Sequence, residues 1–298
     1  MLPRGLFVGL ATLDLVQRVV RWPGVNEKVV AQRSDLAAGG PAAGAAVTFR
    51  ALGGRSVLLS ALGPGPVGRL AARDLARTGV HIVDVWAAGA DLSISAITVL
   101  EETGERSVVS RNAEDLTAVV PGDLPSLIRD VDVVLIDGHN SDVGLAAARA
   151  AQAAGVPVVL DCGSPKPVYA ELVPLADAVV CSAGFAAGPD GADGFDAAAT
   201  AMLADGARLV AMTAGAAPVR WRTREATGVV EVPRVPVRDT LGAGDVLHGA
   251  VAFARAHGVT DPQRCLSFGV AVASLRVQHA GPRAWLNDQR LPGLVAEA

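Results

Sequence analysis

The sequence is poor in the residue types that mark secreted, zinc-binding and nucleic-acid-binding proteins. Only three cysteines occur among 298 residues, and Cys162, Cys181 and Cys265 lie far apart. They form no CxxC pair and no Cys/His spacing suited to zinc, so we expect reduced thiols packed as small core residues. Aromatic residues make up 4% of the chain, and the formal net charge is −4. A nucleic-acid binder would usually present a basic face, so this class is disfavoured.

Long apolar segments are also absent. No apolar run approaches the roughly 20 residues that a membrane-spanning helix needs. The N-terminus has no charged segment leading into a cleavable apolar one, and Asp14 interrupts the first apolar region. We therefore expect a soluble, cytoplasmic protein. The motif G-x-x-x-x-G-K-[ST] does not occur either, which excludes a P-loop kinase.

Apolar residues account for 51% of the chain and charged residues for 19%, which predicts a folded protein. Short, nearly continuous apolar stretches predict buried strands, with helices between them. These stretches are 5–11, 56–62, 131–138, 156–162, 177–182 and 208–213. A hairpin is expected at 219–235, and two helices, at 243–257 and 262–278, close the chain. Such alternation predicts an α/β fold with a mostly parallel sheet and helices on both faces.

Two segments have a different pattern. Residues 15–36 and 93–111 alternate apolar and polar side chains, as a strand with one solvated face does. The second segment contains a turn at Glu102-Thr103-Gly104-Glu105, which is typical of a hairpin. We therefore expect a small β flap, or lid, built from residues 13–37 and 92–112 of a single domain that spans 1–298.

The most informative motif is Asp239-Thr240-Leu241-Gly242-Ala243-Gly244-Asp245. Apolar residues at helical spacing follow it, so the glycines lie at a helix N-terminus, where unpaired N–H groups and the helix dipole attract anions. Asp245 then stands in the first turn beside the anion. A carboxylate there can take a proton from an attacking hydroxyl, and phosphoryl transfer needs such a base. Helix capping is the alternative reading of an isolated Gly-Ala-Gly-Asp.

This motif resembles the C-terminal signature of the ribokinase-like (PfkB) carbohydrate kinases. Gly39-Gly40-Pro41-Ala42-Ala43, followed by a helix and Leu52-Gly53-Gly54, resembles the N-terminal signature of the same family. Together the motifs look most similar to ketohexokinase-like and sulfofructose kinase-like members. The resemblance implies a Rossmann-like core with a β lid, ATP with Mg²⁺ as phosphoryl donor, and a homodimer formed through the lids.

The resemblance also implies roles for individual residues. Asp245 would be the general base, and the N–H groups of Gly242, Ala243 and Gly244 would form the anion hole. Asp14, Gly39 and Gly40 would hold the substrate, Thr213 and Gly215 would contact the nucleotide, and Asp239 and Leu241 would hold a monovalent cation such as K⁺. Lys28 and Asn112 on the lid, and His139 after a buried strand, are further candidates for substrate contact. A solvated strand face for the first two, and a structural histidine for the third, are the alternatives.

Three positions depart from the family pattern. Gly44 stands where many sugar kinases carry an asparagine that binds the sugar, and Pro218 replaces a glycine of the nucleotide segment. The family's Asn-x-x-Glu segment falls near Cys181–Gly184, where no glutamate occurs. The ligands of Mg²⁺ are therefore unassigned, with Asp161 or a water as a substitute for the glutamate.

A second glycine motif suggests another function. Residues 63–68 read Gly-Pro-Gly-Pro-Val-Gly, which matches the G-x-G-x-x-G of dinucleotide-binding folds, and Asp84 follows. Pro64 and Pro66 remove two N–H groups from the loop, so a tight turn is favoured over an NAD-dependent oxidoreductase. We expect an ATP-dependent kinase acting on a hydroxyl of a sugar-like molecule. A nucleoside kinase of the same fold and a non-catalytic nucleotide or sugar sensor are the remaining alternatives.

Overall fold

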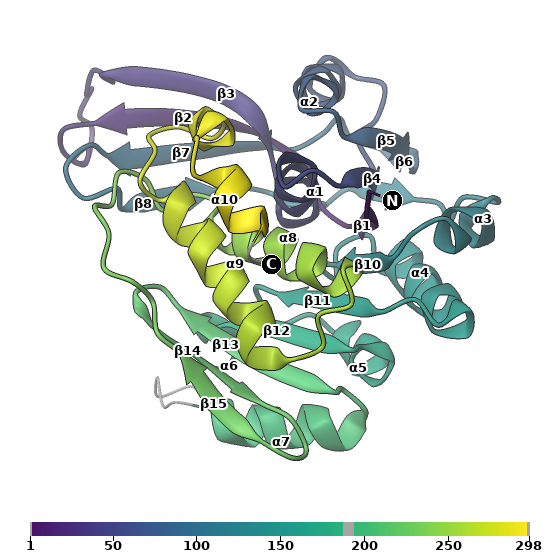
Figure 1. Cartoon of the computed structure of the whole chain (residues 1–298). Coiled ribbons are helices and arrows are strands. Elements are labelled where there is room, and N and C mark those ends of the chain that lie inside the picture. The colour runs from purple at the N-terminus through teal and green to yellow at the C-terminus, as the bar shows by residue number, and fades with distance from the viewer. Residues whose placement is uncertain (1, 187–193, 297–298) are drawn as a thin grey trace.

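The computed structural model describes residues 2–186 and 194–296. Its largest element is a nine-stranded sheet in the order β15-β14-β13-β12-β11-β10-β1-β4-β5 (Figure 1). In chain order these strands are β1 (Arg4–Val8), β4 (Arg55–Ser60), β5 (His81–Asp84), β10 (Val133–Ile136), β11 (Val158–Cys162), β12 (Ala178–Ser182), β13 (Leu209–Ala214), β14 (Ala217–Arg222) and β15 (Thr227–Val230). Neighbouring strands run parallel from β5 through to β13, and β14 and β15 add an antiparallel hairpin. The expected α/β fold is confirmed.

Helices cover both faces of this sheet. One apolar core contains residues of α1 (Pro41–Ala51), α2 (Pro66–Arg77), α8 (Ala243–Ala256), α9 (Pro262–Arg276) and α10 (Leu291–Ala296). The core on the opposite face contains residues of α3 (Leu124–Arg129), α4 (Ser141–Ala154), α5 (Tyr169–Leu172) and α7 (Phe195–Asp205). A short helix, α6 (Ala183–Ala186), follows β12. The fully buried strands β10 and β11 explain the apolar runs of the sequence, because both of their faces are covered.

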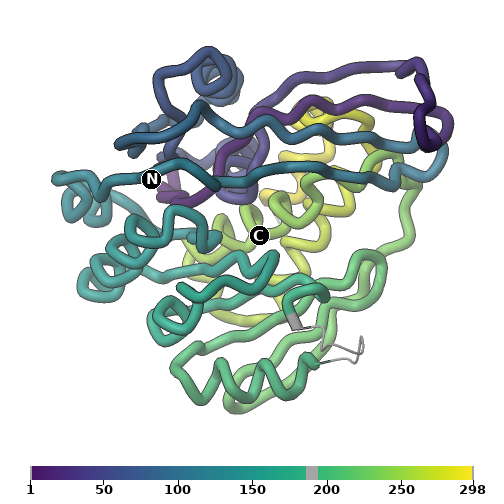
Figure 2. The backbone as a smooth tube through the Cα atoms, turned by 180° about the vertical axis from the view of Figure 1, so that it is seen from behind, coloured from purple at the N-terminus to yellow at the C-terminus, as the bar shows by residue number. Residues whose placement is uncertain are grey.

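A second sheet of four strands stands beside the first, and Figure 2 shows it from behind as the purple and blue-teal strands along the top. Its order is β3-β2-β7-β8, with β2 (Thr12–Val19), β3 (Arg33–Gly39), β7 (Ile94–Leu100) and β8 (Arg106–Val109). We call it the four-stranded sheet. A small pair, β6 (Trp86–Gly89) with β9 (Leu116–Ala118), forms a third sheet.

The sequence pattern extended strand structure too far, most clearly between β2 and β3 and also at residues 231–235 after β15. Residues 20–32 form no strand and connect β2 to β3. Val25 is 95% exposed and Val30 is 73% exposed, so the alternation there has no core to face. Strand pairing begins again only at Arg33, opposite Arg18.

Helices α1 and α8 pack closely, and this contact places the start of α8. A Cβ added to Gly249 would lie 2.6 Å from the carbonyl oxygen of Ala45, so the backbones approach more closely than any larger residue allows. The residues of α1 that lie against Gly249 are Ala45 and Thr48, and both are fully buried. In the described part of the chain, no helix is both long enough and apolar enough to cross a membrane.

Candidate active site

A cavity lies between the four-stranded sheet, α1 and the start of α8. Asp14 and Gly39 line it from β2 and β3, and Gly44 lines it from α1. Gly242 and Asp245 line it from the start of α8. Two carboxylates and the glycine that begins α8 therefore share one cavity, although they are up to 231 residues apart in sequence.

Helix α8 begins beside this cavity. Gly242 is its N-cap and has a left-handed backbone (φ 71°), which glycine adopts without steric cost. The first bond along the helix runs from the Val246 N–H to the Gly242 carbonyl (3.0 Å). The Ala243 N–H donates to the Thr240 carbonyl oxygen (3.3 Å), whereas the N–H groups of Gly244 and Asp245 have no acceptor within the helix. Together with the positive end of the helix dipole, they can bind an anion.

The Asp245 carboxyl group has an unusual pKa. The pKa of this group is raised from 3.8 to about 7, mainly by burial and then by the neighbouring carboxylates of Asp161 and Asp14, while His248 and Arg106 act in the opposite direction. A carboxyl with such a pKa exists near neutral pH both as an acid and as a base. This property suits proton transfer in catalysis, which is most effective when the pKa lies near the working pH.

His248 lies one turn further along α8 and is buried. Its Nδ1 is 2.7 Å from the carbonyl oxygen of Gly244, and its Nε2 is 3.1 Å from that of Val180. Carbonyl oxygens only accept hydrogen bonds, so the ring satisfies both contacts when both nitrogens carry hydrogen. Nδ1 also lies 3.3 Å from the Asp161 carboxylate. His248 thus ties the helix start to the ends of β11 and β12.

Asp14 forms the other acidic wall of the cavity. The Thr12 hydroxyl donates to its carboxylate (2.7 Å), and burial raises the pKa of Asp14 although Thr12 and Ser95 lower it. A Cβ added to Gly39 would lie 1.9 Å from an Asp14 carboxylate oxygen. Only glycine leaves room for that carboxylate against β3.

Gly44 makes equivalent room for the second carboxylate. A Cβ added to Gly44 would lie 2.7 Å from the Asp245 Cβ and 2.8 Å from one of its carboxylate oxygens. The Asp245 side chain therefore packs directly against the backbone of Gly44.

The arrangement combines an anion-binding helix start, a carboxyl with a pKa near 7 and a second carboxylate across the cavity. A family model described as pfkB family carbohydrate kinase matches residues 5–289. The chain belongs to the PfkB family of carbohydrate kinases. It is thus an enzyme of the transferase class, and this membership supports ATP-dependent phosphorylation of a sugar-like substrate.

Relatives of this kinase match along nearly its whole length. Ribokinase of Arabidopsis thaliana is 26% identical over 302 residues, which covers 97% of this chain and 79% of the relative. An ATP-dependent ribose-1-phosphate kinase of Halopiger xanaduensis is 26% identical and covers 94% of both chains. Among solved structures, a candidate ribokinase from Agrobacterium tumefaciens superposes with a TM-score of 0.87 at 26% identity, covering 100% of this chain and 98% of that one.

The other residues expected to contact substrate lie apart from the cavity lining. Gly40 has a left-handed backbone (φ 96°), and a Cβ there would lie 2.4 Å from the Leu10 carbonyl oxygen, so it serves the turn into α1. Lys28 is exposed in the connection between β2 and β3, and Asn112 is exposed after β8. The ring of His139 contacts the Asp137 carboxylate (3.1 Å). Their roles in substrate binding stay predictions.

Asp137 is a buried carboxylate that the sequence motifs did not identify. It accepts hydrogen bonds from the N–H groups of Leu10 (2.8 Å), Ala42 (3.1 Å) and His139 (2.9 Å). Burial alone would raise its pKa, but His139 and these N–H groups bring it below the usual value. Asp137 thereby fixes the end of β1 to the first turn of α1, which positions Gly39 and Gly44.

The glycine loop at residues 63–68 uses its own N–H groups. Leu62 and Gly63 donate to the Asp84 carboxylate (2.9 and 3.1 Å), and Val67 and Gly68 donate to Asp91 (3.0 and 3.1 Å). These donors are therefore occupied by the protein's own carboxylates and are not directed at a pyrophosphate. The loop is a tight turn between β4 and α2, as the prolines predicted.

The predicted nucleotide residues lie at the far end of β13. Thr213 donates to the Cys181 carbonyl (3.4 Å), and Gly215 has a left-handed backbone (φ 61°) in the turn to β14. A Cβ added to Gly215 would meet no atom within 4 Å. The turn is thus open, and the role of both residues in nucleotide binding stays a prediction.

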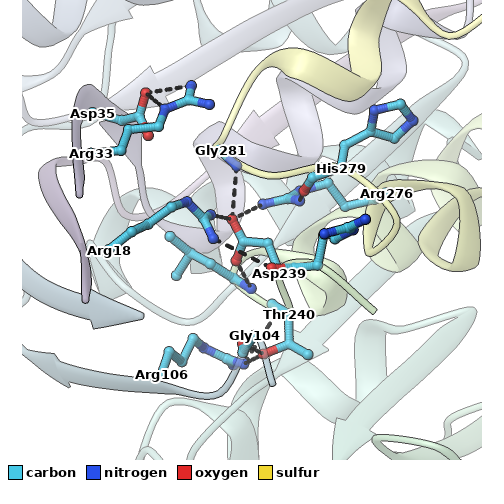
Figure 3. A network of polar contacts seen from close by, with 12 residues as sticks. Arg18, Arg33, Asp35, Gly104, Arg106, Asp239, Thr240, Arg276, His279 and Gly281 are labelled. Carbon is cyan, nitrogen blue, oxygen red and sulfur yellow. Dashed lines mark hydrogen bonds and ion pairs between the residues drawn. The ribbon is translucent and has the colours of Figure 1, made fainter. Parts of the chain in front are cut away.

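Asp239, expected to help hold a monovalent cation, lies at the centre of the network in Figure 3. It is completely buried and pairs with Arg18 and Arg276. The carboxylate also accepts from the N–H groups of Leu241 (2.9 Å) and Gly281 (3.1 Å). In the described residues, no group of three or more His, Cys, Asp or Glu side chains is arranged to hold a metal ion.

Proposed function

We propose that Asp245 is the general base of a reaction that transfers the terminal phosphoryl group of ATP to a hydroxyl of a sugar-like acceptor. Asp245 takes the hydroxyl proton, the acceptor oxygen bonds to the γ-phosphorus, and the bond from that phosphorus to the β-phosphate oxygen breaks. ADP leaves, and the N–H groups at the start of α8 stabilise the charge on the transferring oxygens.

The observation that carries this proposal is the position of Asp245. Its carboxyl stands in the first turn of α8, beside the anion-binding N–H groups, and lines the same cavity as Asp14. Asp14 is placed to accept hydrogen bonds from the hydroxyls of the acceptor, and the backbone of Gly39 lies against it. An acceptor held by Asp14 would therefore present a hydroxyl toward Asp245 and the bound phosphate.

Asp161 is a suitable ligand for Mg²⁺. It is a buried carboxylate at the end of β11, and it lies 3.3 Å from Nδ1 of His248, one turn after Asp245 on α8. Mg²⁺ in kinases is held by one or two carboxylates together with phosphate oxygens. Burial raises the pKa of Asp161 as well, and a cation favours the ionised form of such a carboxylate. When bound, Mg²⁺ would neutralise charge on the phosphates.

The test is ADP release from Mg-ATP over a panel of sugars, sugar acids, sulfosugars and nucleosides. Asp245→Asn should lower kcat by about 10²–10⁴, the usual contribution of a general base, while ATP binding measured by calorimetry persists. Asp205→Asn is the matched control, because Asp205 is an exposed carboxylate at the end of α7. Near-normal turnover of Asp245→Asn would contradict the assignment of the base. ATP binding without turnover on the whole panel would favour the sensor alternative.

The outer face of the four-stranded sheet supports a homodimer. Leu15 is paired with Leu36 on one side and with Ala96 on the other, and Ala96 is paired with Val109. Paired residues point to the same face of a sheet, so these four form an apolar stripe. Leu36 is 52% exposed and Val109 is 72% exposed. We propose that a second copy of the chain covers this stripe, because exposed apolar patches mark association surfaces.

A further inference from the structure

The strongest feature that the proposed function leaves unused is the network around Asp239. Its Oδ1 accepts from the Leu241 N–H, and its Oδ2 accepts from the Gly281 N–H. The same Oδ2 contacts the guanidinium groups of Arg18 and, at 3.3 Å, Arg276. The side chains of Arg18 and Arg276 and the Gly281 N–H converge on this carboxylate from different parts of the chain, as Figure 3 shows.

These residues do not fit a bound monovalent cation. Arg18 is 1% exposed and Arg276 is 2% exposed, so water does not screen their charges from the carboxylate. Both carboxylate oxygens already have N–H donors. A cation at Asp239 would have to displace one guanidinium and then lie beside the other, where like charges repel. Asp239 and the two arginines together carry a net charge of +1. The surroundings of the carboxylate therefore already have an excess of positive charge.

The arginines also connect the four-stranded sheet to the loop that enters α8. Arg18 lies on β2 and donates a second hydrogen bond to the Arg238 carbonyl (3.3 Å). Arg106 on β8 donates to the carbonyl and hydroxyl oxygens of Thr240 (3.2 and 2.9 Å), and the Thr240 hydroxyl donates to the Gly104 carbonyl (3.0 Å).

The opposite side of the loop is fixed as well. Arg276 is the last residue of α9 and donates to the His279 carbonyl (2.9 Å). Leu241 packs against the small apolar cluster of Val16, Ile97 and Val99 inside the four-stranded sheet. Residues 239–241 are therefore held from both sides immediately before the anion-binding glycine Gly242.

We propose that Arg18 and Arg276 are built-in cations that hold residues 239–242 in the conformation needed for phosphate binding, so that catalysis requires neither K⁺ nor another monovalent cation. Both are positioning residues, since they act through Asp239. Arg18 does so from the four-stranded sheet, which links the placement of that sheet to the shape of the anion hole. This inference rests on the proposed kinase function.

The first experiment uses the unmodified protein in KCl, NaCl and tetramethylammonium chloride at equal ionic strength. Initial rates of ADP release and the midpoint of thermal unfolding are measured in each salt. We expect both to be the same in the three salts. A cation that bound the native state would raise the unfolding midpoint, so a K⁺-specific rise in midpoint or in rate would overturn the inference. If no acceptor gives turnover in any salt, the proposed function fails, while the unfolding midpoints still decide this inference.

The second experiment removes one built-in cation. Arg18→Ala should lower kcat by about tenfold to a hundredfold, the cost of misplacing a catalytic group, and millimolar guanidinium or K⁺ should restore part of the rate. Arg208→Ala is the control, because Arg208 is 80% exposed. A purely structural residue would lower the amount of folded protein without creating this cation response. Normal kcat for Arg18→Ala, or loss without any rescue in folded protein, would overturn the inference. If that variant does not fold, Arg18→Lys keeps the charge and should retain both folding and cation independence.

Discussion

Replacing Asp245 by asparagine should make the protein more stable while it removes the activity. The physical reason is the raised pKa of the Asp245 carboxyl, which shows that the folded protein disfavours its ionised form. Burial is the first cause, and the carboxylates of Asp161 and Asp14 add to it. Asparagine has nearly the same shape and no charge, so it removes this cost and keeps the packing against Gly44.

The magnitude follows from the two pKa values. A change from 3.8 in the unfolded chain to about 7 in the folded protein corresponds to about 4 kcal/mol at 1.36 kcal/mol per pH unit. Water entering the cavity screens the charge, and roughly half of that value, about 2 kcal/mol, is expected to be measured. Because the folded-state pKa is the higher one, the protonated group favours folding at low pH. That contribution to the free energy of unfolding is lost as the pH rises from about 4 to about 7. At higher pH this group no longer changes the free energy of unfolding.

The assay is urea unfolding of the metal-free protein at about pH 5 and about pH 8, where the linkage predicts different costs. At both pH values, Asp245→Asn should have a larger free energy of unfolding than the unmodified protein. The difference between the two proteins should be larger by about 1 kcal/mol at the higher pH. Asp205→Asn should show no such trend. A variant that is less stable than the unmodified protein at high pH, or a difference independent of pH, would refute the reasoning.

Two further predictions concern the cavity and the four-stranded sheet. Gly44→Ala should displace Asp245, since the new Cβ would lie 2.7 Å from the Asp245 Cβ. We expect kcat to fall by about tenfold to a hundredfold, while ATP affinity measured by calorimetry stays unchanged. A normal kcat would contradict this prediction and show that α1 can move aside. Val109→Lys should place a charge in the apolar stripe and turn a homodimer into a monomer in sedimentation velocity, with Val25→Lys, on an exposed connection, as control. A monomeric unmodified protein would contradict the dimer.

Sequence patterns predicted the fold well where the signal is local. The start of α8 is an example, because Gly242, the following small residues and the helical spacing after Asp245 lie within a few positions of one another. The end of α4 is determined in the same local way, since Gly155 stops the helix in a left-handed conformation. The prediction of strand structure at residues 20–32 was wrong, because an alternating pattern does not show whether a neighbouring strand is present to pair with.

The parts of the site that escaped prediction depend on distant partners. Asp137 receives the Leu10 and Ala42 N–H groups across 127 and 95 residues; it lies in the predicted buried strand 131–138, but nothing near it in sequence indicates these partners. His248 is similar, because its Nε2 contacts the Val180 carbonyl 68 residues away. Such side chains become recognisable only when the order of the strands is known.

The pairing of Arg18 with Asp239 shows how one register decides the chemistry of a distant loop. The two residues are 221 positions apart, and Arg18 reaches the loop because it shares the inner face of β2 with Asp14 and Val16, four and two residues before it. A slip of one residue would present Leu15 and Gln17 instead. It would leave the Asp239 carboxylate buried without Arg18 and remove Asp14 from the cavity. The register of β2 therefore sets the acidic wall of the cavity and the positive charge behind the anion hole together, so a change that shifts this strand should impair both.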